Sequence, residues 1–191
     1  MRILLVEDDL EQANAIETAL HSHFSDLTIW NLYDEYAFRC ALPSLRDDPP
    51  DIVIMDVILR WHSTAPSFPP PPPDVREGGV YRSGLRCLAM LLKSSEFSKT
   101  PVVLYSALDR GNVSRELENL PDHVFFLTKD SSDTSLILHL RSLQAAVGAP
   151  PAAPSGWRSR LWQSIEVKPG WLGFAIDLKR FIRGKPSKRD R

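Results

Sequence analysis

Short apolar runs alternate with longer amphipathic segments along roughly the first 145 residues. The runs have the length and β-branched composition of strands buried in a parallel sheet, and they occupy residues 2–6, 27–30, 51–55, 101–105 and 123–127. Apolar residues at helical spacing follow each run: Leu10, Ala13, Ile16 and Leu20; Tyr36, Ala37, Cys40 and Ala41; Leu85, Leu88, Ala89 and Leu92; Val113 and Leu117; Leu136, Ile137, Leu140 and Leu143. Because each parallel strand needs a crossover to return, five such units predict a doubly wound α/β domain.

Two proline-rich segments interrupt this alternation. Residues 61–79 contain five successive prolines at 69–73, which disfavour a helix interior or an inner strand and favour an extended polyproline II spacer. We expect an exposed insertion between the third strand and its helix, either a solvated loop or a docking site for a proline-reading domain. Residues 148–156, GAPPAAPSG, have the composition of a linker. The predicted organisation is a domain over 1–147, a linker and a tail over 157–191.

The tail differs from the rest of the chain in charge. The whole chain has a net charge of −1, but residues 145–191 carry ten Lys/Arg and three Asp/Glu. An apolar stripe at helical spacing predicts an amphipathic helix: Trp171, Phe174, Ala175, Leu178, Phe181 and Ile182. Three roles remain open for this basic helix: packing onto the acidic domain, docking in the groove of a partner protein, or contacting an anionic membrane surface. A tail of this length is short for a DNA-binding output domain, so binding to DNA is disfavoured.

Composition excludes several other classes. With 43% hydrophobic and 25% charged residues, the 191-residue chain is typical of globular proteins. Its two cysteines form no C-x-x-C pair, so neither a disulfide framework nor a zinc site is expected. No segment has the length of a signal-peptide core or a membrane span, and the expected location is cytoplasmic.

Carboxylates follow two of the predicted strands. Glu7 and Asp8 come directly after the first strand, and Asp56 comes directly after the third. If the strand order is 2-1-3-4-5, these acids meet at the carboxyl edge of the sheet, where ligands bind in open parallel sheets. Three carboxylates brought together need a cation, and a set of oxygen ligands suits Mg²⁺.

Two further polar residues end the remaining strands at the same edge. Ser106 follows the fourth run and can donate a hydroxyl hydrogen bond, while Lys129 follows the fifth and supplies a positive charge. Acids, hydroxyl and ammonium together predict a site that accepts a phosphoryl group. Asp56 would be the nucleophile, and Mg²⁺ and Lys129 would neutralise the charge of the transferring group.

Four segments in order resemble the response regulator receiver domain of two-component signalling, the CheY-like family: ILLVEDD, DIVIMDVIL, PVVLYSAL and FFLTKD. The resemblance covers about residues 1–145 and implies a flavodoxin-like (βα)5 fold. It implies the following roles: Asp56 as phosphoacceptor, Glu7 and Asp8 as the metal-binding acid pair with Asp56, the Ile58 backbone carbonyl as a further metal ligand, Ser106 as switch hydroxyl, Lys129 as active-site lysine and Phe126 as the aromatic switch.

Two positions depart from the family pattern, and a third matches it. Asp130 and Arg60 each stand where the family commonly has proline, after the lysine and after the acceptor strand respectively. Both departures lie next to residues of the predicted site. Gly84 matches the glycine that opens the family's third helix.

The expected function is therefore Mg²⁺-dependent phosphorylation of Asp56 by a histidine kinase or phosphotransfer protein. Phosphorylation would remodel the face formed by the fourth helix, fifth strand and fifth helix for a downstream protein partner. Such a protein accepts and loses a phosphoryl group and is not a turnover enzyme. The alternative is a phosphate-independent adaptor that binds partners through the proline-rich insertion and the basic tail. A haloacid dehalogenase-type phosphatase is disfavoured, because MDVIL lacks the second Asp of that family's D-x-D motif.

Overall fold

The computed structural model describes residues 1–62, 69–118, 120–130 and 132–148. The predicted tail, and the predicted linker beyond Gly148, lie outside the described residues. The domain boundaries and the amphipathic tail helix therefore remain predictions. No helix among the residues described is long and apolar enough to cross a membrane.

Five parallel strands form one sheet in the order β2-β1-β3-β4-β5, which confirms the predicted fold class and strand order. The strands are β1 (Arg2–Val6), β2 (Thr28–Leu32), β3 (Ile52–Met55), β4 (Val102–Ser106) and β5 (Val124–Thr128). All residues of β3 and β4 are buried. Strand β3 is apolar at every position because helices cover both faces of the sheet.

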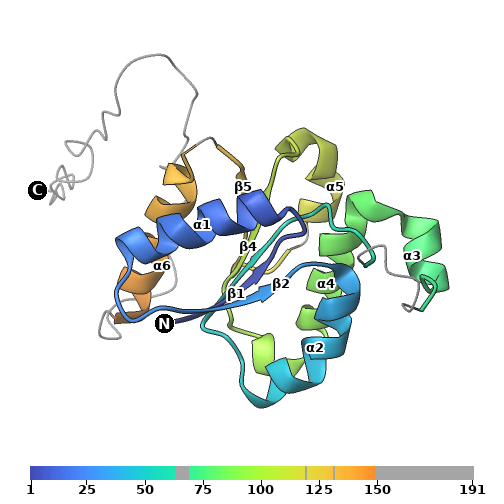
Figure 1. The fold of residues 1–191 in the computed structure, drawn as a ribbon, viewed down its shortest axis with the longest axis horizontal. Coiled ribbons are helices and arrows are strands. Elements are labelled where there is room, and N and C mark those ends of the chain that lie inside the picture. The colour runs from blue at the N-terminus through green and yellow to red at the C-terminus, as the bar shows by residue number, and fades with distance from the viewer. Residues whose placement is uncertain (63–68, 119, 131, 149–191) are drawn as a thin grey trace, which may run out of the picture. The chain divides into compact units, whose positions relative to one another are not determined.

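Helices lie on both faces of the sheet, as Figure 1 shows: α1 and α6 cover one face, and α2 and α4 cover the other. The α-helices are α1 (Leu10–His23), α2 (Glu35–Asp47), α3 (Pro73–Gly78), α4 (Ser83–Leu92), α5 (Ser114–Leu117) and α6 (Thr134–Gly148). Short 3-10 helices are η1 (Val80–Arg82), η2 (Ser95–Phe97) and η3 (Arg110–Val113). The fourth predicted helix is thus a four-residue turn, α5, preceded by η3.

The buried faces of three helices differ in part from the predicted ones. Helix α4 buries Cys87, Leu88 and Leu91, whereas Ala89 of its predicted stripe is exposed. Helix α2 buries Glu35, Phe38, Leu42 and Leu45 rather than the predicted stripe that contains the exposed Cys40. The larger side chains at i, i+4 and i+7 decide which face packs on the sheet, since they bury more apolar area than Ala or Cys. In α1, Leu10 is 60% exposed, although Ala13, Ile16 and Leu20 are buried as predicted.

The described part of the insertion is not wholly a solvated loop. Pro73 is the first residue of α3, a position that tolerates proline because its N–H would have no helical partner. Val75 of α3 is buried, and Arg39 of α2 forms an ion pair with Asp74. The end of the insertion that leads into α4 is therefore packed against α2.

Candidate functional site

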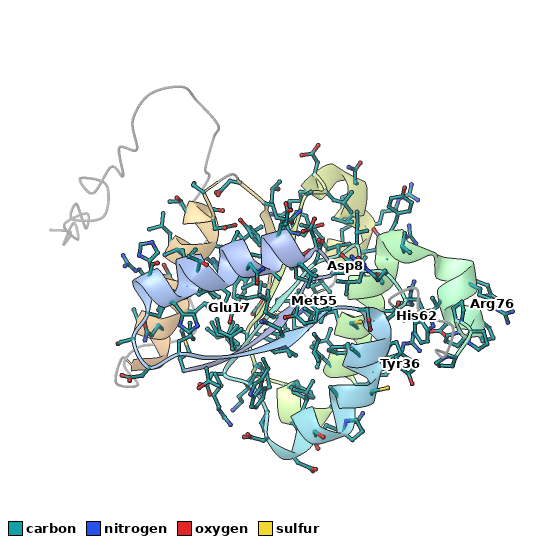
Figure 2. All side chains as sticks on the ribbon, viewed as in Figure 1. Asp8, Glu17, Tyr36, Met55, His62 and Arg76 are labelled. Atoms are coloured by element: carbon teal, nitrogen blue, oxygen red, sulfur yellow. The ribbon has the colours of Figure 1, made fainter. Side chains whose placement is uncertain are left out.

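The carboxyl edge of the sheet brings four of the predicted residues together. Val6, the last residue of β1, lies opposite Met55, the last residue of β3, so Glu7 and Asp56 leave adjacent strands at the same level. The Asp56 N–H donates to the Val6 carbonyl at 2.9 Å. Figure 2 labels Asp8 and Met55 at this edge. The strand order, and not proximity in sequence, assembles the site.

Three hydrogen bonds hold the Asp56 carboxylate in place. Its Oδ1 accepts hydrogen bonds from the Ser106 hydroxyl at 2.6 Å and from the Ile58 N–H at 3.1 Å. Its Oδ2 accepts a hydrogen bond from Lys129 Nζ at 2.6 Å. Ser106 is fully buried and Asp56 is 8% exposed. The carboxylate is therefore fixed in orientation by neighbours on β4 and β5, which the sequence predicted to end beside it.

Lys129 joins the two acids that lie on adjacent strands. Its Nζ also donates to Glu7 Oε2 at 2.7 Å and to Gln12 Oε1 at 2.6 Å. Burial alone would lower the pKa of Lys129, but the Asp56 and Glu7 carboxylates outweigh it and raise the pKa. Lys129 is thus a stably charged ammonium. Gln12 was missed by the sequence analysis, because a glutamine in the first turns of a helix carries no distinguishing pattern.

Glu7 is the most deeply buried acid of the site. Burial raises its pKa from 4.5 to about 7, although the Lys129 ammonium opposes that shift. The folded protein therefore keeps a proton on Glu7 at acidities where the unfolded chain has lost it. Near neutral pH, the charge of the site changes with small changes in pH.

This shift predicts a pH dependence of stability. The folded state binds more protons than the unfolded state between pH 4.5 and about 7, so the free energy of unfolding should fall as the pH rises through that window. The expected loss due to Glu7 is on the order of 2 to 3 kcal/mol. Urea unfolding of the wild type and of Glu7→Gln, from pH 5 to 8 without divalent cations, measures it. Parallel pH profiles of the two proteins would rule the assignment out.

Asp8, predicted to be the more direct metal ligand of the acid pair, contacts Arg60. The Arg60 N–H and Nε donate to Asp8 Oδ2 at 3.1 and 2.9 Å, and Arg60 Nη2 donates to the Asp8 carbonyl oxygen. Ile58, whose backbone carbonyl is the other predicted ligand, lies in the same loop as Arg60 and donates its N–H to Asp56. The predicted ligands are all oxygen atoms, the type of donor that a magnesium ion prefers. Within the described residues, no group of three or more His, Cys, Asp or Glu is arranged so that it could hold a metal ion.

Asp130 does not add its charge to the cluster around Asp56. Its carboxylate accepts hydrogen bonds from the N–H groups of Ser132, Thr134 and Ser135, each at 3.2 Å, at the start of α6. Burial would raise the pKa of Asp130, but hydrogen bonding by the side chain and N–H of Ser135 and by the N–H groups of Ser132 and Thr134 prevails and lowers it. Asp130 therefore stabilises the start of α6, a role that the family's proline could not fill.

Phe126, the predicted aromatic switch, lies in the middle of β5 opposite Leu104. It is partly buried and packs against the hydrophobic core. Its role as a switch remains a prediction.

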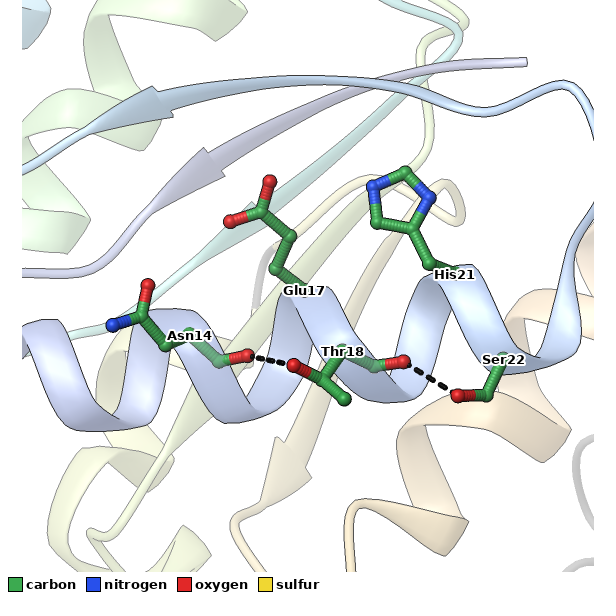
Figure 3. Close-up of a pocket in the computed structure, with 5 residues that line it drawn as sticks. All are labelled: Asn14, Glu17, Thr18, His21 and Ser22. Atoms are coloured by element: carbon green, nitrogen blue, oxygen red, sulfur yellow. Dashed lines mark hydrogen bonds between the residues drawn. The ribbon is translucent and has the colours of Figure 1, made fainter.

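A surface hollow on α1 lies away from this edge. It measures about 530 Å³ and is lined by Asn14, Glu17, Thr18, His21 and Ser22 (Figure 3). The hydroxyls of Thr18 and Ser22 donate to carbonyls of the preceding turn, and all five residues come from one helix. It is an open helix surface that contains none of the predicted site residues.

No protein-family model and no curated protein sequence matches this chain. Solved structures do match it in fold. The phosphorylated cyanobacterial phytochrome response regulator RcpA is 18% identical, with a TM-score of 0.55 over 79% of this chain and 98% of that chain. The signal receiver domain of a signal transduction histidine kinase from Syntrophus aciditrophicus is 24% identical, with a TM-score of 0.54 over 81% and 98%.

A third match is the receiver domain of the Francisella response regulator 1452, which is 21% identical with a TM-score of 0.52 over 76% of this chain and 98% of that chain. All three structures are matched over almost their whole length. The likeness in sequence is low, so the shared feature is the fold and the strand order that produces it. This chain therefore has the fold of a response regulator receiver domain.

Proposed function

We propose that this chain is a phosphoacceptor response regulator of a two-component or phosphorelay system, with Asp56 as the acceptor. The observation that supports this most is the Asp56 carboxylate, held between the Ser106 hydroxyl at 2.6 Å and the Lys129 ammonium at 2.6 Å. A fixed carboxylate beside a cation and a hydroxyl donor is the arrangement that phosphoryl transfer to an acid needs. The cognate donor would be a phosphohistidine of a histidine kinase or phosphotransfer protein, and we propose that the protein acts in the cytoplasm.

In this proposal an Asp56 oxygen attacks the phosphorus atom, a P–O bond forms, and the P–N bond to the donor imidazole breaks. Lys129 neutralises charge on the transferred group, and Ser106 donates its hydroxyl hydrogen bond to a phosphoryl oxygen instead of to the carboxylate. A bound magnesium ion would supply further neutralisation of that charge. Glu7, Asp8, Asp56 and the Ile58 carbonyl are the groups that would hold it. The chain acts as an acceptor and not as a turnover enzyme.

The output follows from the position of Ser106 at the end of β4. Movement of its hydroxyl toward a phosphoryl group would release space that Phe126 can fill from β5, two positions along the paired register. This change would alter the face formed by α5, β5 and α6, where a downstream protein partner would bind. The described residues contain no DNA-binding helix-turn-helix, so we propose a protein-interaction output.

The proposal predicts a single phosphoryl adduct on Asp56. Incubation of the full chain with Mg²⁺ and acetyl phosphate should add the mass of one phosphoryl group to the wild type and none to Asp56→Ala. Asp51→Ala is the matched control, because Asp51 is an exposed acid on the opposite end of β3. Intact mass spectrometry reads the result. An unmodified wild type that also fails to bind beryllofluoride would favour the phosphate-independent adaptor.

A further inference from the structure

Arg60 is a charged residue that contacts the predicted metal ligand Asp8 and that the proposed function does not use. Its main chain is fixed beside the start of α2, since the Glu35 N–H donates to the Arg60 carbonyl at 3.0 Å and the Tyr36 N–H to the Trp61 carbonyl at 2.9 Å. The Trp61 ring lies edge-on to Tyr36 and under the Arg39 guanidinium, 5.3 Å from the ring centre. The main chain of Arg60 is therefore held in place, which fixes the position from which its side chain extends.

The side chain returns across the carboxyl edge of the sheet to Asp8. Two donors of Arg60, the main-chain N–H and Nε, reach the same oxygen, Asp8 Oδ2, and Nη2 reaches the Asp8 carbonyl. Asp8 is 21% exposed at its side chain, and Arg60 is 51% exposed. Arg60 thus holds both the side chain and the backbone of one residue, and its guanidinium remains open to solvent.

Each of the three carboxyl groups of the site contacts a side-chain cation. Glu7 and Asp56 both contact Lys129, and Asp8 contacts Arg60. A magnesium ion needs carboxylate oxygens at about 2.0 to 2.1 Å in octahedral geometry. The Arg60 guanidinium and a magnesium ion would compete for Asp8 Oδ2, and a guanidinium that stays nearby repels the ion.

We propose that Arg60 is a positioning residue that holds Asp8 in a metal-free arrangement and lowers the affinity of the site for Mg²⁺. This inference rests on the proposed function, which makes Asp8 a metal ligand. Arg60 acts through Asp8 and touches neither donor nor phosphoryl group. Because the Arg60 side chain is half exposed, its ion pair with Asp8 is weak, and a sufficient concentration of Mg²⁺ can open it.

Substitution of Arg60 should therefore tighten Mg²⁺ binding. Loss of an exposed ion pair of this kind typically changes an equilibrium constant a fewfold. Removal of the positive charge also removes its repulsion of Mg²⁺. The Kd of Arg60→Ala for Mg²⁺ is therefore expected to fall by roughly three- to tenfold. Arg60→Lys keeps the charge but loses the forked contact, and its Kd should lie between the two. Arg76→Ala is the matched control, because Arg76 is an exposed arginine at the outer side of α3 in Figure 2, and its Kd should equal that of the wild type.

The measurement is isothermal titration calorimetry of the full chain with MgCl₂, at fixed ionic strength and with no phosphodonor. A tighter Kd in Arg60→Ala that is lost when Asp8→Asn is added supports the inference. An equal or weaker Kd in Arg60→Ala overturns the inference, and it leaves the proposed function standing if the wild type binds Mg²⁺. Failure of every variant to bind Mg²⁺ at millimolar concentration overturns both the inference and the magnesium dependence of the proposed function.

Discussion

Replacement of Glu35 by alanine is expected to destabilise the domain by about 3 to 5 kcal/mol, because it leaves partly buried cations without their carboxylate. Glu35 is fully buried at the start of α2. Its Oε2 accepts from Arg86 Nη2 at 2.6 Å, and its Oε1 accepts from Arg86 Nε at 3.0 Å and from Arg39 Nη2 at 2.7 Å. One carboxylate therefore satisfies two guanidinium groups that approach from α2 and α4.

The network extends beyond this pair of helices. Arg39 also contacts Asp74 of α3, and Arg86 Nη1 donates to the Gly79 carbonyl at 2.8 Å. Loss of Glu35 should therefore loosen the described end of the insertion as well as the contact between α2 and α4. Removal of one partner of a buried ion pair costs more free energy than the intact pair contributes to stability, because the remaining charges are left poorly solvated.

Urea unfolding of three variants tests this expectation. Glu35→Gln keeps the shape and part of the hydrogen bonding, so its loss of stability should be smaller than that of Glu35→Ala. Glu11→Ala is the control, because Glu11 occupies the first turn of α1 in the same way but is exposed, and its change should stay within about 0.5 kcal/mol. Equal unfolding midpoints for Glu35→Ala and Glu11→Ala would show that the buried network contributes nothing to stability.

The strands and their order could be predicted from the sequence because both follow from simple patterns. A run such as Ile52–Met55 is apolar at every position, which indicates burial on both faces, and the alternation with helices requires parallel strands. Once the order is known, residues directly after the strands must meet at one edge. Glu7, Asp56, Ser106 and Lys129 were therefore predictable as neighbours, even though 122 positions separate the outermost two.

The partners of the acids could not be predicted in the same way. Asp8 and Arg60 are 52 positions apart, and Glu35 and Arg86 are 51 apart, so neither pair follows from local spacing. The predicted apolar stripe of α2 does not include Glu35, because a carboxylate does not count as a core residue in a hydrophobic pattern. Its burial becomes understandable when the two arginines are brought to it by the fold. Specific ion pairing of this kind is decided by tertiary structure.

A second large effect is expected from Gly84→Ala. Gly84 is the second residue of α4, and its N–H donates to the Val57 carbonyl at 2.9 Å. A Cβ at this position would lie 2.0 Å from the Asp56 carbonyl oxygen and 2.8 Å from the Val57 Cα. Both are backbone atoms that cannot rotate away, so the helix or the Asp56 loop must move. We expect a loss of at least about 3 kcal/mol, the upper end of the usual cost of overpacking.

The same substitution should also reduce phosphorylation, because the clash falls on Asp56, the proposed phosphoacceptor. Displacement of Asp56 by a few tenths of an ångström would lengthen its contacts with Ser106 and Lys129, both now 2.6 Å. Gly111→Ala is the matched control, since a Cβ at Gly111 meets nothing within 4 Å, and its stability should change by no more than about 0.5 kcal/mol. Urea midpoints, together with acetyl phosphate labelling of the fraction that remains folded, separate the two effects. The expectation would be contradicted if Gly84→Ala were as stable and as readily labelled as Gly111→Ala. The close approach of α4 would then not be what positions Asp56.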